Sequence, residues 1–524
     1  MTLKALLQDV PHEVIQMGNE GILREITAIA IDSRKVTKGG LYICLLGLSV
    51  DGHRFVDDVA RAGAGAVLVE KFSKSELWPP GSGRVHPRPD NWDGRLQLRR
   101  NYPPDVTVIE VENTRQAMAH IAANAYGRPA EKLQLIGVTG TNGKTTTTHF
   151  IDEILRGLGH TTGLIGTNGI RIGGELIDIP FATSTTPDPL ELQQIFALML
   201  EQGVKYVVME VSSHALAFYK MEGLVFDVGV FTNLTQDHLD LHGTMDNYRL
   251  AKAILFAQSK FGVGNVDDES TATMFSHLNS RPRITYGLDN TAVIRAIHIQ
   301  YGPDGTVFEL HGQSYTLPAK GRFNVYNALA AIGTMCALGL DSVDIPSDGR
   351  EAANREAIHM AVGNLMGVPG RIQSVPNNID AHVLVDYAHS PDGVENIITS
   401  VREFTTGRVI IIIGCGGDRD KTKRPIMGRI AGSLADYCIL TSDNPRTEDP
   451  MTIIAQVEEG TKSANANYEI CENRRDAIFI GAGMLKPGDA LIIAGKGHED
   501  YQIIDTTKHH FSDYETAVEA LAQK

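Results

Sequence analysis

Cysteine is scarce in this chain. Its 524 residues include five cysteines, an odd number, and no two of them have C-x-x-C spacing. The pattern therefore favours neither a disulfide framework nor a zinc site, and it fits a reducing compartment. The five are Cys44, Cys336, Cys415, Cys438 and Cys471. We expect a cytoplasmic protein.

Long apolar runs and a basic excess are also missing. No stretch approaches the roughly 18 apolar residues of a membrane-spanning helix, and polar residues interrupt every apolar run in residues 1–19. The formal net charge of −15 argues against a general nucleic-acid or membrane-surface binder, while allowing a local pocket for anions. We expect no targeting segment, no membrane partner and no nucleic-acid partner.

The composition, with 42% hydrophobic and 21% charged residues, is that of a soluble globular protein, and the length suggests three domains. Short apolar runs alternate with helical patterns along the whole chain, which predicts α/β domains with mostly parallel sheets. The runs predicted as strands are 28–32, 41–45, 66–69, 106–111, 133–138, 206–211, 225–231, 383–385, 409–414 and 490–494. Helices are expected at 55–62, 114–125 and from Lys144. We place the domains at 1–128, 129–370 and 371–524.

An insert interrupts the first domain at residues 73–104. It holds six of the 22 prolines, five arginines and both tryptophans, Trp78 and Trp92, and it has no helical or strand periodicity. A surface loop is the simpler interpretation. A docking segment that uses the tryptophans is the alternative.

A glycine-rich turn lies between the apolar run at 133–138 and the helix that follows it. Gly140 and Gly143 permit backbone conformations that let amide groups close around phosphate oxygens, at the positive end of the helix. Lys144 is placed to reach the β- and γ-phosphates of a nucleotide, and the Thr145 hydroxyl to contact Mg²⁺. The pattern predicts a phosphate-binding loop, with a chance Gly-Lys-Thr as the alternative.

The match to the G-x-x-x-x-G-K-[ST] pattern is imperfect, because Val138 stands where the first glycine belongs and Gly137 comes one residue early. The form Gly-Thr-Asn-Gly-Lys-Thr at residues 140–145 resembles that of Mur ligases and their folylpolyglutamate synthetase relatives. These enzymes form amide bonds with ATP. The resemblance implies an N-terminal UDP-binding domain, a central P-loop ATPase and a C-terminal Rossmann-like domain that brings the amino acid.

Two further residues suggest chemistry in the central domain. Glu210 ends a buried apolar run, where a carboxylate is costly unless it meets a cation. Lys252 lies in an apolar helical segment, where a lysine alone is more often a surface residue with a buried stem. The resemblance implies that Lys252 is carbamylated and binds Mg²⁺ together with Thr145, Glu210 and His238. His214 and His242 are expected to be structural.

The resemblance also implies an ATP site shared by the central and C-terminal domains. Asn327 is expected near adenine, although a helix-capping role is a fair alternative, and Arg371 and Asp386 match positions that hold ATP when the domains close. The implied ATP-binding residues are Gly137, Thr139, Gly140, Thr141, Asn142, Gly143, Lys144, Thr145, Thr146, Asn327, Arg371 and Asp386.

Within the family, the resemblance over the whole chain is to members that add meso-2,6-diaminopimelate to UDP-N-acetylmuramoyl-L-alanyl-D-glutamate. The implied residues for the UDP-linked substrate are Ile31, Ser33, Leu48, Ser49, Val50, Ser184, Thr185, Thr186, Ser212 and Lys220. Those for the amino acid are Arg419, Asp443, Asn444, Pro445, Arg446, Gly495 and Glu499. Arg446 carries the choice of amino acid, because its planar fork can pair the second carboxylate of diaminopimelate, whereas it would repel the ammonium of lysine.

Two positions depart from the family pattern: Lys220 stands at a usual arginine and Phe218 at a usual glutamine, which puts both muramoyl contacts in doubt. The insert and residues 347–364 have no counterpart that we can assign. The expected function is an ATP-dependent, ADP-forming ligase of peptidoglycan precursor synthesis, and hence of cell wall biogenesis, cell shape and cell division. We expect a monomer that acts through an acyl phosphate. The rivals are a folylpolyglutamate synthetase, a lysine-adding ligase and a regulatory P-loop ATPase.

Overall fold

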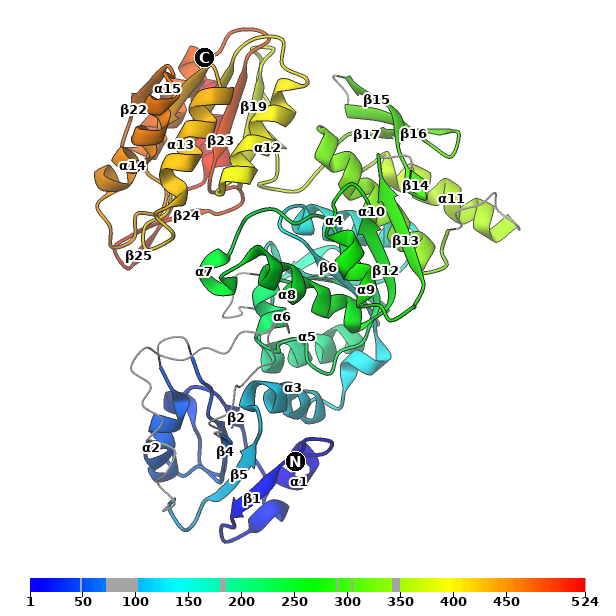
Figure 1. The fold of residues 1–524 in the computed structure, drawn as a ribbon, viewed down its shortest axis with the longest axis vertical. Coiled ribbons are helices and arrows are strands. Elements are labelled where there is room, and N and C mark those ends of the chain that lie inside the picture. Colours follow the sequence, from blue (N-terminus) through cyan, green and yellow to red (C-terminus); the bar gives the residue numbers. More distant parts are fainter. Residues whose placement is uncertain are drawn as a thin grey trace.

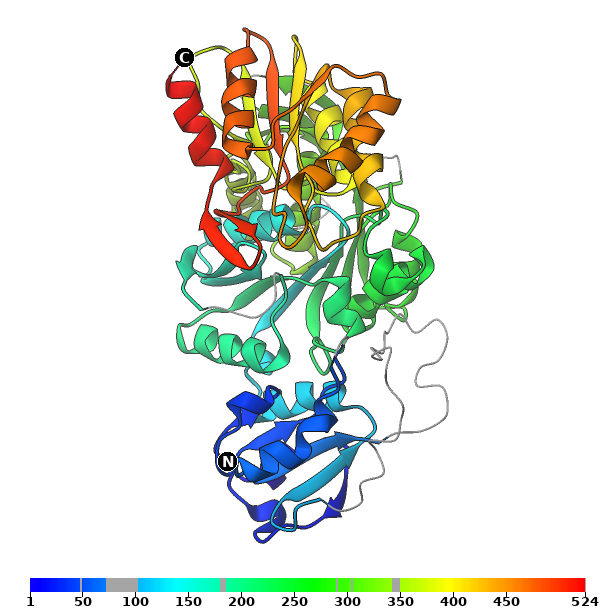
Figure 2. The same cartoon turned by 90° about the vertical axis from the view of Figure 1, so that its left-hand side faces the viewer.

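Three large β-sheets, each packed against helices, follow one another along the long axis of the molecule (Figure 1). The computed structural model describes residues 1–47, 50–71, 102–179, 185–288, 291–302, 305–341 and 349–523. The N-terminal sheet lies at one end, the largest sheet in the middle and the C-terminal sheet at the other end (Figures 1 and 2). Most of the 73–104 insert lies outside the described residues, so the two interpretations of it stay open.

The N-terminal part is a sheet of strand order β1-β5-β4-β3-β2, in which only β1 runs antiparallel to its neighbour. Asn113 begins the long helix by accepting a hydrogen bond from the amide of Gln116. The elements are α1 (Leu3–Leu6), β1 (Glu13–Gln16), β2 (Ile29–Ala30), β3 (Leu41–Ile43), α2 (Val56–Arg61), β4 (Ala66–Glu70), β5 (Thr107–Val111) and α3 (Thr114–Ala125).

The central sheet has the order β14-β13-β12-β11-β6-β10-β7-β8-β9, parallel from β14 to β7 and antiparallel from β7 to β9. Its central strands β6, β10 and β11 are mostly apolar and buried, because helices cover both faces of the sheet. The elements are β6 (Gln134–Thr139), α4 (Lys144–Gly157), β7 (Thr162–Gly166), β8 (Gly169–Ile172), β9 (Glu175–Ile177), α5 (Pro189–Glu201), β10 (Tyr206–Glu210), α6 (Ser213–Ala217), β11 (Phe226–Phe231), α7 (Leu239–His242), α8 (Met245–Ala257), β12 (Ser259–Asn265), α9 (Thr271–Ser276), β13 (Arg283–Gly287) and β14 (Ile294–Arg295).

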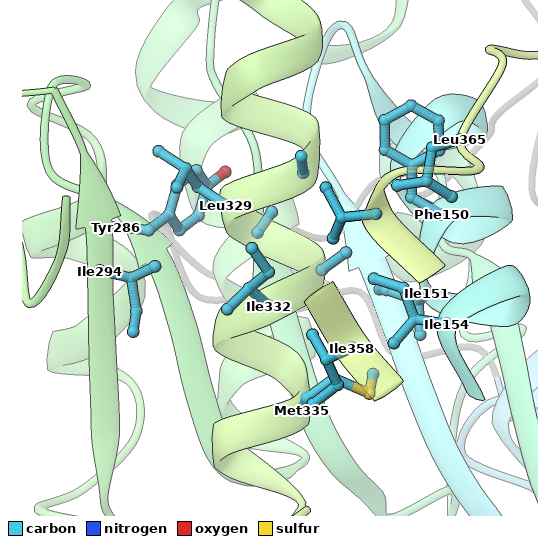
Figure 3. Close-up of a cluster of buried hydrophobic side chains, with 14 of the residues drawn as sticks. Phe150, Ile151, Ile154, Tyr286, Ile294, Leu329, Ile332, Met335, Ile358 and Leu365 are labelled. Atoms are coloured by element: carbon cyan, nitrogen blue, oxygen red, sulfur yellow. The ribbon is translucent and has the colours of Figure 1, made fainter. Parts of the chain in front are cut away.

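A small antiparallel sheet and two helices complete the central part. They are β15 (Ile297–Gly302), β16 (Gly305–Leu310), β17 (Gln313–Leu317), α10 (Arg322–Ala337) and α11 (Gly349–Val362). Side chains of α10, such as Leu329 and Ile332, pack between Phe150 and Ile154 of α4 on one side and Tyr286 of β13 on the other (Figure 3). This cluster fixes α4, and therefore the phosphate loop before it, against the sheet.

The C-terminal sheet has the order β18-β19-β23-β20-β21-β22 and is parallel except for β18. β20 reads Val-Ile-Ile-Ile-Ile and is buried on both faces, as a central parallel strand should be. The elements are β18 (Gln373–Ser374), β19 (His382–Asp386), α12 (Pro391–Arg402), β20 (Val409–Ile413), α13 (Lys423–Leu434), β21 (Tyr437–Leu440), α14 (Pro450–Ser463), β22 (Tyr468–Ile470), α15 (Arg474–Met484), β23 (Ala490–Ala494), β24 (Tyr501–Ile504), β25 (Thr507–His510) and α16 (Asp513–Ala522).

The predicted α/β class with mostly parallel sheets is confirmed, and each predicted strand corresponds to an observed one. The capping role considered for Asn327 is wrong, because α10 begins at Arg322 and Gly321 precedes it. Among the described residues, none of the helices combines the length and apolar character that crossing a membrane requires.

Candidate active site

The phosphate loop follows β6, at the carboxyl end of the central sheet. Any side chain at Gly140 would collide with Thr232, and one at Gly143, where φ is +83°, would lie 2.6 Å from the Asn327 side chain. Only glycine therefore fits either position. Lys144 folds back over the loop, and its Nζ donates hydrogen bonds to the carbonyl oxygens of Gly140 and Thr141 at 2.8 Å.

Glu210 ends β10 beside this loop and is 1% exposed. Its Oε2 accepts a hydrogen bond from the Thr145 hydroxyl at 3.1 Å, and its Oε1 accepts one from the Thr167 amide at 2.8 Å. The strand end therefore brings a buried carboxylate and the first helical hydroxyl together. This is an oxygen pair suited to a hard cation.

Lys252 projects from α8 into the same region and is 1% exposed. Its Nζ donates to the Gly140 carbonyl oxygen at 2.8 Å and lies 4.3 Å from the centre of the Tyr248 ring. Burial, together with the nearby Lys144 charge, lowers the pKa of Lys252 well below that of a free lysine. The sequence alternative of a surface lysine with a buried stem is wrong, because the amine itself is buried.

His238 adopts a left-handed backbone conformation just before α7, with φ of +53°. Burial lowers its pKa far below the ordinary value, so the imidazole is neutral and can act as a ligand at neutral pH. His242 is buried at 3% exposure and lies 3.0 Å from the Ser213 hydroxyl through Nε2. That contact agrees with a structural role for His242.

A cavity of about 490 Å³ opens between the central and C-terminal sheets. It is lined by residues of both parts of the chain, which suits a ligand that must be held between two domains. The predicted site residues that line it are Thr141, Asn142, Gly143, Lys144, Thr145, Thr146, Thr185, Glu210, Ser212, His238, Lys252, Asn327, Arg371 and Asp386.

Several predicted ATP-binding residues lie below the loop and do not line this cavity. Gly137 is in β6, where a side chain would meet Leu255 and Phe226 at 2.8–2.9 Å. Its lack of a side chain therefore serves packing against α8. Thr139 is fully buried, and Gly140 faces the cavity region only through the hydrogen bonds of its carbonyl oxygen.

The C-terminal part closes directly onto the phosphate loop. The Asp392 carboxylate, at the start of α12, accepts hydrogen bonds from the Asn142 side chain and from the Thr235 hydroxyl, the latter at 2.9 Å. Arg371 Nη2 lies 3.4 Å from the Thr145 hydroxyl. Asp386, at the end of β19, accepts the amides of Ile372 and Ala388 at 2.8 Å and so fixes the turn that carries Arg371.

The residues predicted for the muramoyl part lie only partly in the cavity lining, to which Thr185 and Ser212 belong. Thr186 donates to the Glu210 carbonyl oxygen at 3.0 Å and contacts the Ser212 hydroxyl at 3.3 Å. Lys220 forms an ion pair with Asp188 at 2.9 Å. Thr186 and Lys220 do not line the cavity, and Ser184 lies outside the described residues.

Phe218, the second departure from the family pattern, supports a contact between domains. The Arg115 guanidinium of α3 stacks on its ring, 5.0 Å from the centre, and Arg115 Nη2 donates to the Leu46 carbonyl oxygen at 2.7 Å. The loop expected to hold the UDP part is thereby joined to the central domain. Sequence analysis missed Arg115, because an arginine in an amphipathic helix carries no local sign of such a contact.

The N-terminal residues expected to hold uridine are remote from the cavity. Ile31 and Ser33 lie in the turn after β2, and Val50 is 48% exposed. Leu48 and Ser49 lie outside the described residues. The described members of the predicted set, Ile31, Ser33 and Val50, therefore belong to the N-terminal part and do not line the cavity.

The predicted amino-acid residues gather at the carboxyl end of the C-terminal sheet. Arg446 has φ of +51°, and its Nη1 donates to the Gly417 carbonyl oxygen at 2.7 Å. Asn444 Nδ2 donates to Glu499 Oε2 at 2.9 Å. Arg419 is exposed, whereas Asp443 and Pro445 are buried. Gly495 has φ of +120°, and a side chain there would meet Asp443 at 2.6 Å.

Sequence analysis missed three charged residues of this region. Lys496 is fully buried next to Asp443 and Glu499, Arg424 pairs with Glu448, and Asp392 contacts the phosphate loop. Lys496 lies between two residues that the sequence analysis did name, Gly495 and Glu499. A lysine among small residues near the end of an apolar strand is the signal that could have found it.

Within the described residues, no group of three or more His, Cys, Asp or Glu side chains is arranged to hold a metal ion. The unmodified chain supplies Glu210 and His238 as charged or imidazole donors near the Thr145 hydroxyl. An anionic group at Lys252 would add a further oxygen donor. The residues present therefore fit Mg²⁺ on the condition that Lys252 is carbamylated.

Fold and site together define a class: a P-loop protein of three α/β parts, whose nucleotide cavity is closed by its C-terminal part. Family models agree with this division. The Mur ligase family catalytic domain matches residues 25–126, the Mur ligase middle domain residues 138–335, and the Mur ligase glutamate ligase domain residues 370–497. The chain belongs to the Mur ligase family.

Relatives match the chain over its whole length. A Bacillus cereus protein named UDP-N-acetylmuramoyl-L-alanyl-D-glutamate--2,6-diaminopimelate ligase is 43% identical, covering 99% of this chain and 98% of the relative. A Clostridium acetobutylicum protein of the same name, numbered 1, is 40% identical over 100% of both chains. A solved structure of a ligase with this name is similar at a TM-score of 0.62 and 29% identity, covering 100% of this chain and 99% of the other.

More distant structures share the fold. A folylpolyglutamate synthase from Mycobacterium tuberculosis, complexed with ADP and AMPPCP, matches at a TM-score of 0.59 and 18% identity, over 72% of this chain and 92% of its own. MurF from Acinetobacter baumannii matches at a TM-score of 0.60 and 18% identity, over 100% and 99%.

Proposed function

We propose that this chain is an ATP-dependent ligase that adds meso-2,6-diaminopimelate to UDP-N-acetylmuramoyl-L-alanyl-D-glutamate in peptidoglycan precursor synthesis. The observation that carries the proposal is the cavity between the phosphate loop and the C-terminal part. The same C-terminal part holds the residues that we predict for the amino acid, among them Asn444, Arg446 and Glu499. Full-length relatives of about 40% identity that carry this name support the substrate. A cytoplasmic location is part of the proposal, and the use of ATP and a UDP-linked substrate supports it.

The proposed reaction has two steps. The γ-carboxylate oxygen of D-glutamate attacks the γ-phosphorus of ATP, an O–P bond forms, and ADP leaves. The diaminopimelate amine then attacks the acyl carbon, an amide N–C bond forms, phosphate leaves, and the amine proton goes to solvent or phosphate. Water must be kept from the acyl phosphate between the steps, which is the task of the closed interface.

Lys144 is the residue we assign to the transferring phosphate. Its ammonium is held above the loop by two carbonyl oxygens and forms no ion pair within the described residues. An ATP phosphate supplies the anion that this cation lacks, and the charge of Lys144 is then directed at the oxygens that gain charge in the transition state. The loop amides and the N-terminus of α4 act on the same group.

Lys252 is assigned a carbamate. Its neutral amine nitrogen attacks the carbon of carbon dioxide, an N–C bond forms as one C–O π bond breaks, and the amine proton goes to solvent. The resulting anion, Thr145, Glu210 and His238 are the oxygen and nitrogen donors that would hold Mg²⁺. Bound Mg²⁺ supplies neutralisation of the phosphate charge. The burial of Lys252 beside the cavity supports this assignment.

Closure is assigned to Asp392, Arg371 and Asp386. Asp392 contacts the loop residue Asn142, so the position of the C-terminal part is coupled directly to the phosphate loop. We propose domain boundaries at 1–128, 129–370 and 371–524, supported by a turn with φ of +73° at Gly370.

Phosphate release from ATP tests the function. The protein is mixed with Mg-ATP and the UDP-linked dipeptide, and with diaminopimelate, lysine or no amine. Of the three mixtures, we expect rapid phosphate release only in the one that contains diaminopimelate. Release with lysine would indicate a lysine-adding enzyme, and equal release without any amine would indicate a regulatory ATPase.

A further inference from the structure

Lys496 lies at the centre of the charged groups in the amino-acid region, at the end of β23 and fully buried. Its Nζ donates hydrogen bonds to Asn444 Oδ1 at 3.0 Å and to the Tyr501 carbonyl oxygen at 2.8 Å. It also lies 3.1 Å from Asp443 Oδ1 and 3.7 Å from Glu499 Oε2. A buried ammonium with this many partners is held in one position.

These contacts determine the orientation of the Asn444 amide. Its Oδ1 accepts from Lys496 and also from the backbone amide of Ile503 at 2.8 Å. Because an amide has one oxygen and one NH₂ group, two donors at Oδ1 force Nδ2 to the other side. There Nδ2 donates to Glu499 Oε2 at 2.9 Å. The lysine thus acts on Glu499 through Asn444.

Only one oxygen of the Glu499 carboxylate accepts a hydrogen bond from the described residues. Its Oε2 is taken by Asn444, whereas its Oε1 accepts no hydrogen bond within the described part of the chain. Burial and the Asp443 charge raise the pKa of Glu499, and the charges of Lys496 and Arg446 oppose that shift. A carboxylate next to a second carboxylate needs such a cation if it is to stay ionised and fixed.

We propose that Lys496 is a positioning residue for the amino-acid substrate. It fixes the Asn444 amide and thereby presents Glu499 to the distal ammonium group of the incoming diamino acid, while Arg446 faces the distal carboxylate. The proposal rests on the proposed function and deepens it. In this proposal, recognition of the distal ammonium group by Glu499 depends on Lys496. Recognition of the distal carboxylate by Arg446 does not.

The division can be tested with two amine substrates. Diaminopimelate carries the distal ammonium, and 2-aminopimelate has the same chain and distal carboxylate without it. In the wild type, kcat/KM for diaminopimelate should exceed that for 2-aminopimelate. In Lys496→Met this ratio should fall by about ten- to a hundredfold, the range of a hydrogen bond to a charged group, mostly through the KM of diaminopimelate.

Two variants separate positioning from a general loss of structure. Lys496→Arg keeps the charge and should restore part of the ratio. Arg408→Met removes a partly exposed ion pair, with Asp489 at 2.6 Å, at the amino ends of strands β20 and β23 of the same sheet, and should leave the ratio unchanged. If Lys496→Met does not fold, Asn444→Asp places a negative charge against Glu499 and should lower the same ratio.

An equal proportional loss for both amines in Lys496→Met, or an unchanged ratio in Asn444→Asp, would overturn the inference. A wild-type protein that ligates neither amine would instead reject the proposed function. The two failures are therefore distinguishable in one set of assays.

Discussion

Basic side chains have different partners in the C-terminal and central domains. In the C-terminal domain each of three fully buried cations faces a carboxylate: Arg424 with Glu448 at 2.9 Å, Arg474 with Asp513 at 2.7 Å and Lys496 with Asp443 at 3.1 Å. In the central domain Lys144 and Lys252 donate to backbone carbonyl oxygens and form no ion pair within the described residues.

The difference separates two tasks. A cation that already has its carboxylate contributes to a fixed, nearly neutral framework, which suits recognition of a substrate by shape and charge pattern. A lysine held by carbonyl oxygens alone has no carboxylate to offset its charge. An anionic ligand can then pair with it, as we assign to Lys144, or its amine can lose the proton and be modified, as we assign to Lys252. The contrast agrees with the phosphate chemistry that we propose for the central domain and with the selection of the amino acid that we propose for the C-terminal domain.

Removal of Lys144 should have the largest effect on activity. We expect Lys144→Ala to lower kcat by about three orders of magnitude or more, because its charge acts on the transferring phosphate. Affinity for the UDP-linked substrate should stay nearly unchanged in a binding titration. The exposed Lys260, which pairs with Asp227, offers the control Lys260→Ala. A large loss of UDP-substrate binding in Lys144→Ala would contradict the assignment.

Lys252→Ala should lower activity by about a thousandfold, because an anionic oxygen ligand is lost. Small carboxylic acids should restore part of it by filling the vacated space. The wild-type protein should carry the mass of one extra carboxyl group, removable by the substitution. An unmodified amine at Lys252 in a high-resolution map of the Mg²⁺-bound protein would refute the carbamate.

For stability we expect the larger effect from the carboxylate-paired Arg474 and the smaller one from Lys144. Arg474→Met leaves Asp513 buried without its partner and should lower the free energy of unfolding by about 3–5 kcal/mol. Lys144→Ala breaks no ion pair and should change it by less than about 1 kcal/mol. Denaturant unfolding measures both. Equal losses of unfolding free energy in the two variants would contradict the contrast between carboxylate-paired and carbonyl-bound basic residues.

Much of the fold followed from the sequence, because apolar runs and glycine turns are local signals. The loop at Gly140 and the helix from Lys144 were predicted to the residue. Contacts between distant segments could not be predicted in this way. The hydrogen bond from Asn142 to Asp392 joins residues 250 positions apart, and the stack of Arg115 on Phe218 joins two domains.

The site residues show the same limit. Motif matching named Glu210 and Lys252, which line the cavity, and also Gly137, which lies in β6 and serves packing. The motif alone did not separate these two kinds of residue. It also missed Lys496, because its role depends on two loops that meet only in the fold.

The choice of amino acid is tested most directly at Arg446. Its Nη1 is held by the Gly417 carbonyl oxygen, which leaves the other guanidinium nitrogens for a substrate carboxylate. We expect wild type to prefer diaminopimelate to lysine, and Arg446→Ala to lower kcat/KM for diaminopimelate by roughly two to four orders of magnitude, a loss of about 3–5 kcal/mol. Lysine should gain little, since loss of repulsion creates no site for its ammonium. The kcat/KM values of both amines in both proteins decide the matter: an equal proportional drop, or a wild-type preference for lysine, would contradict the account.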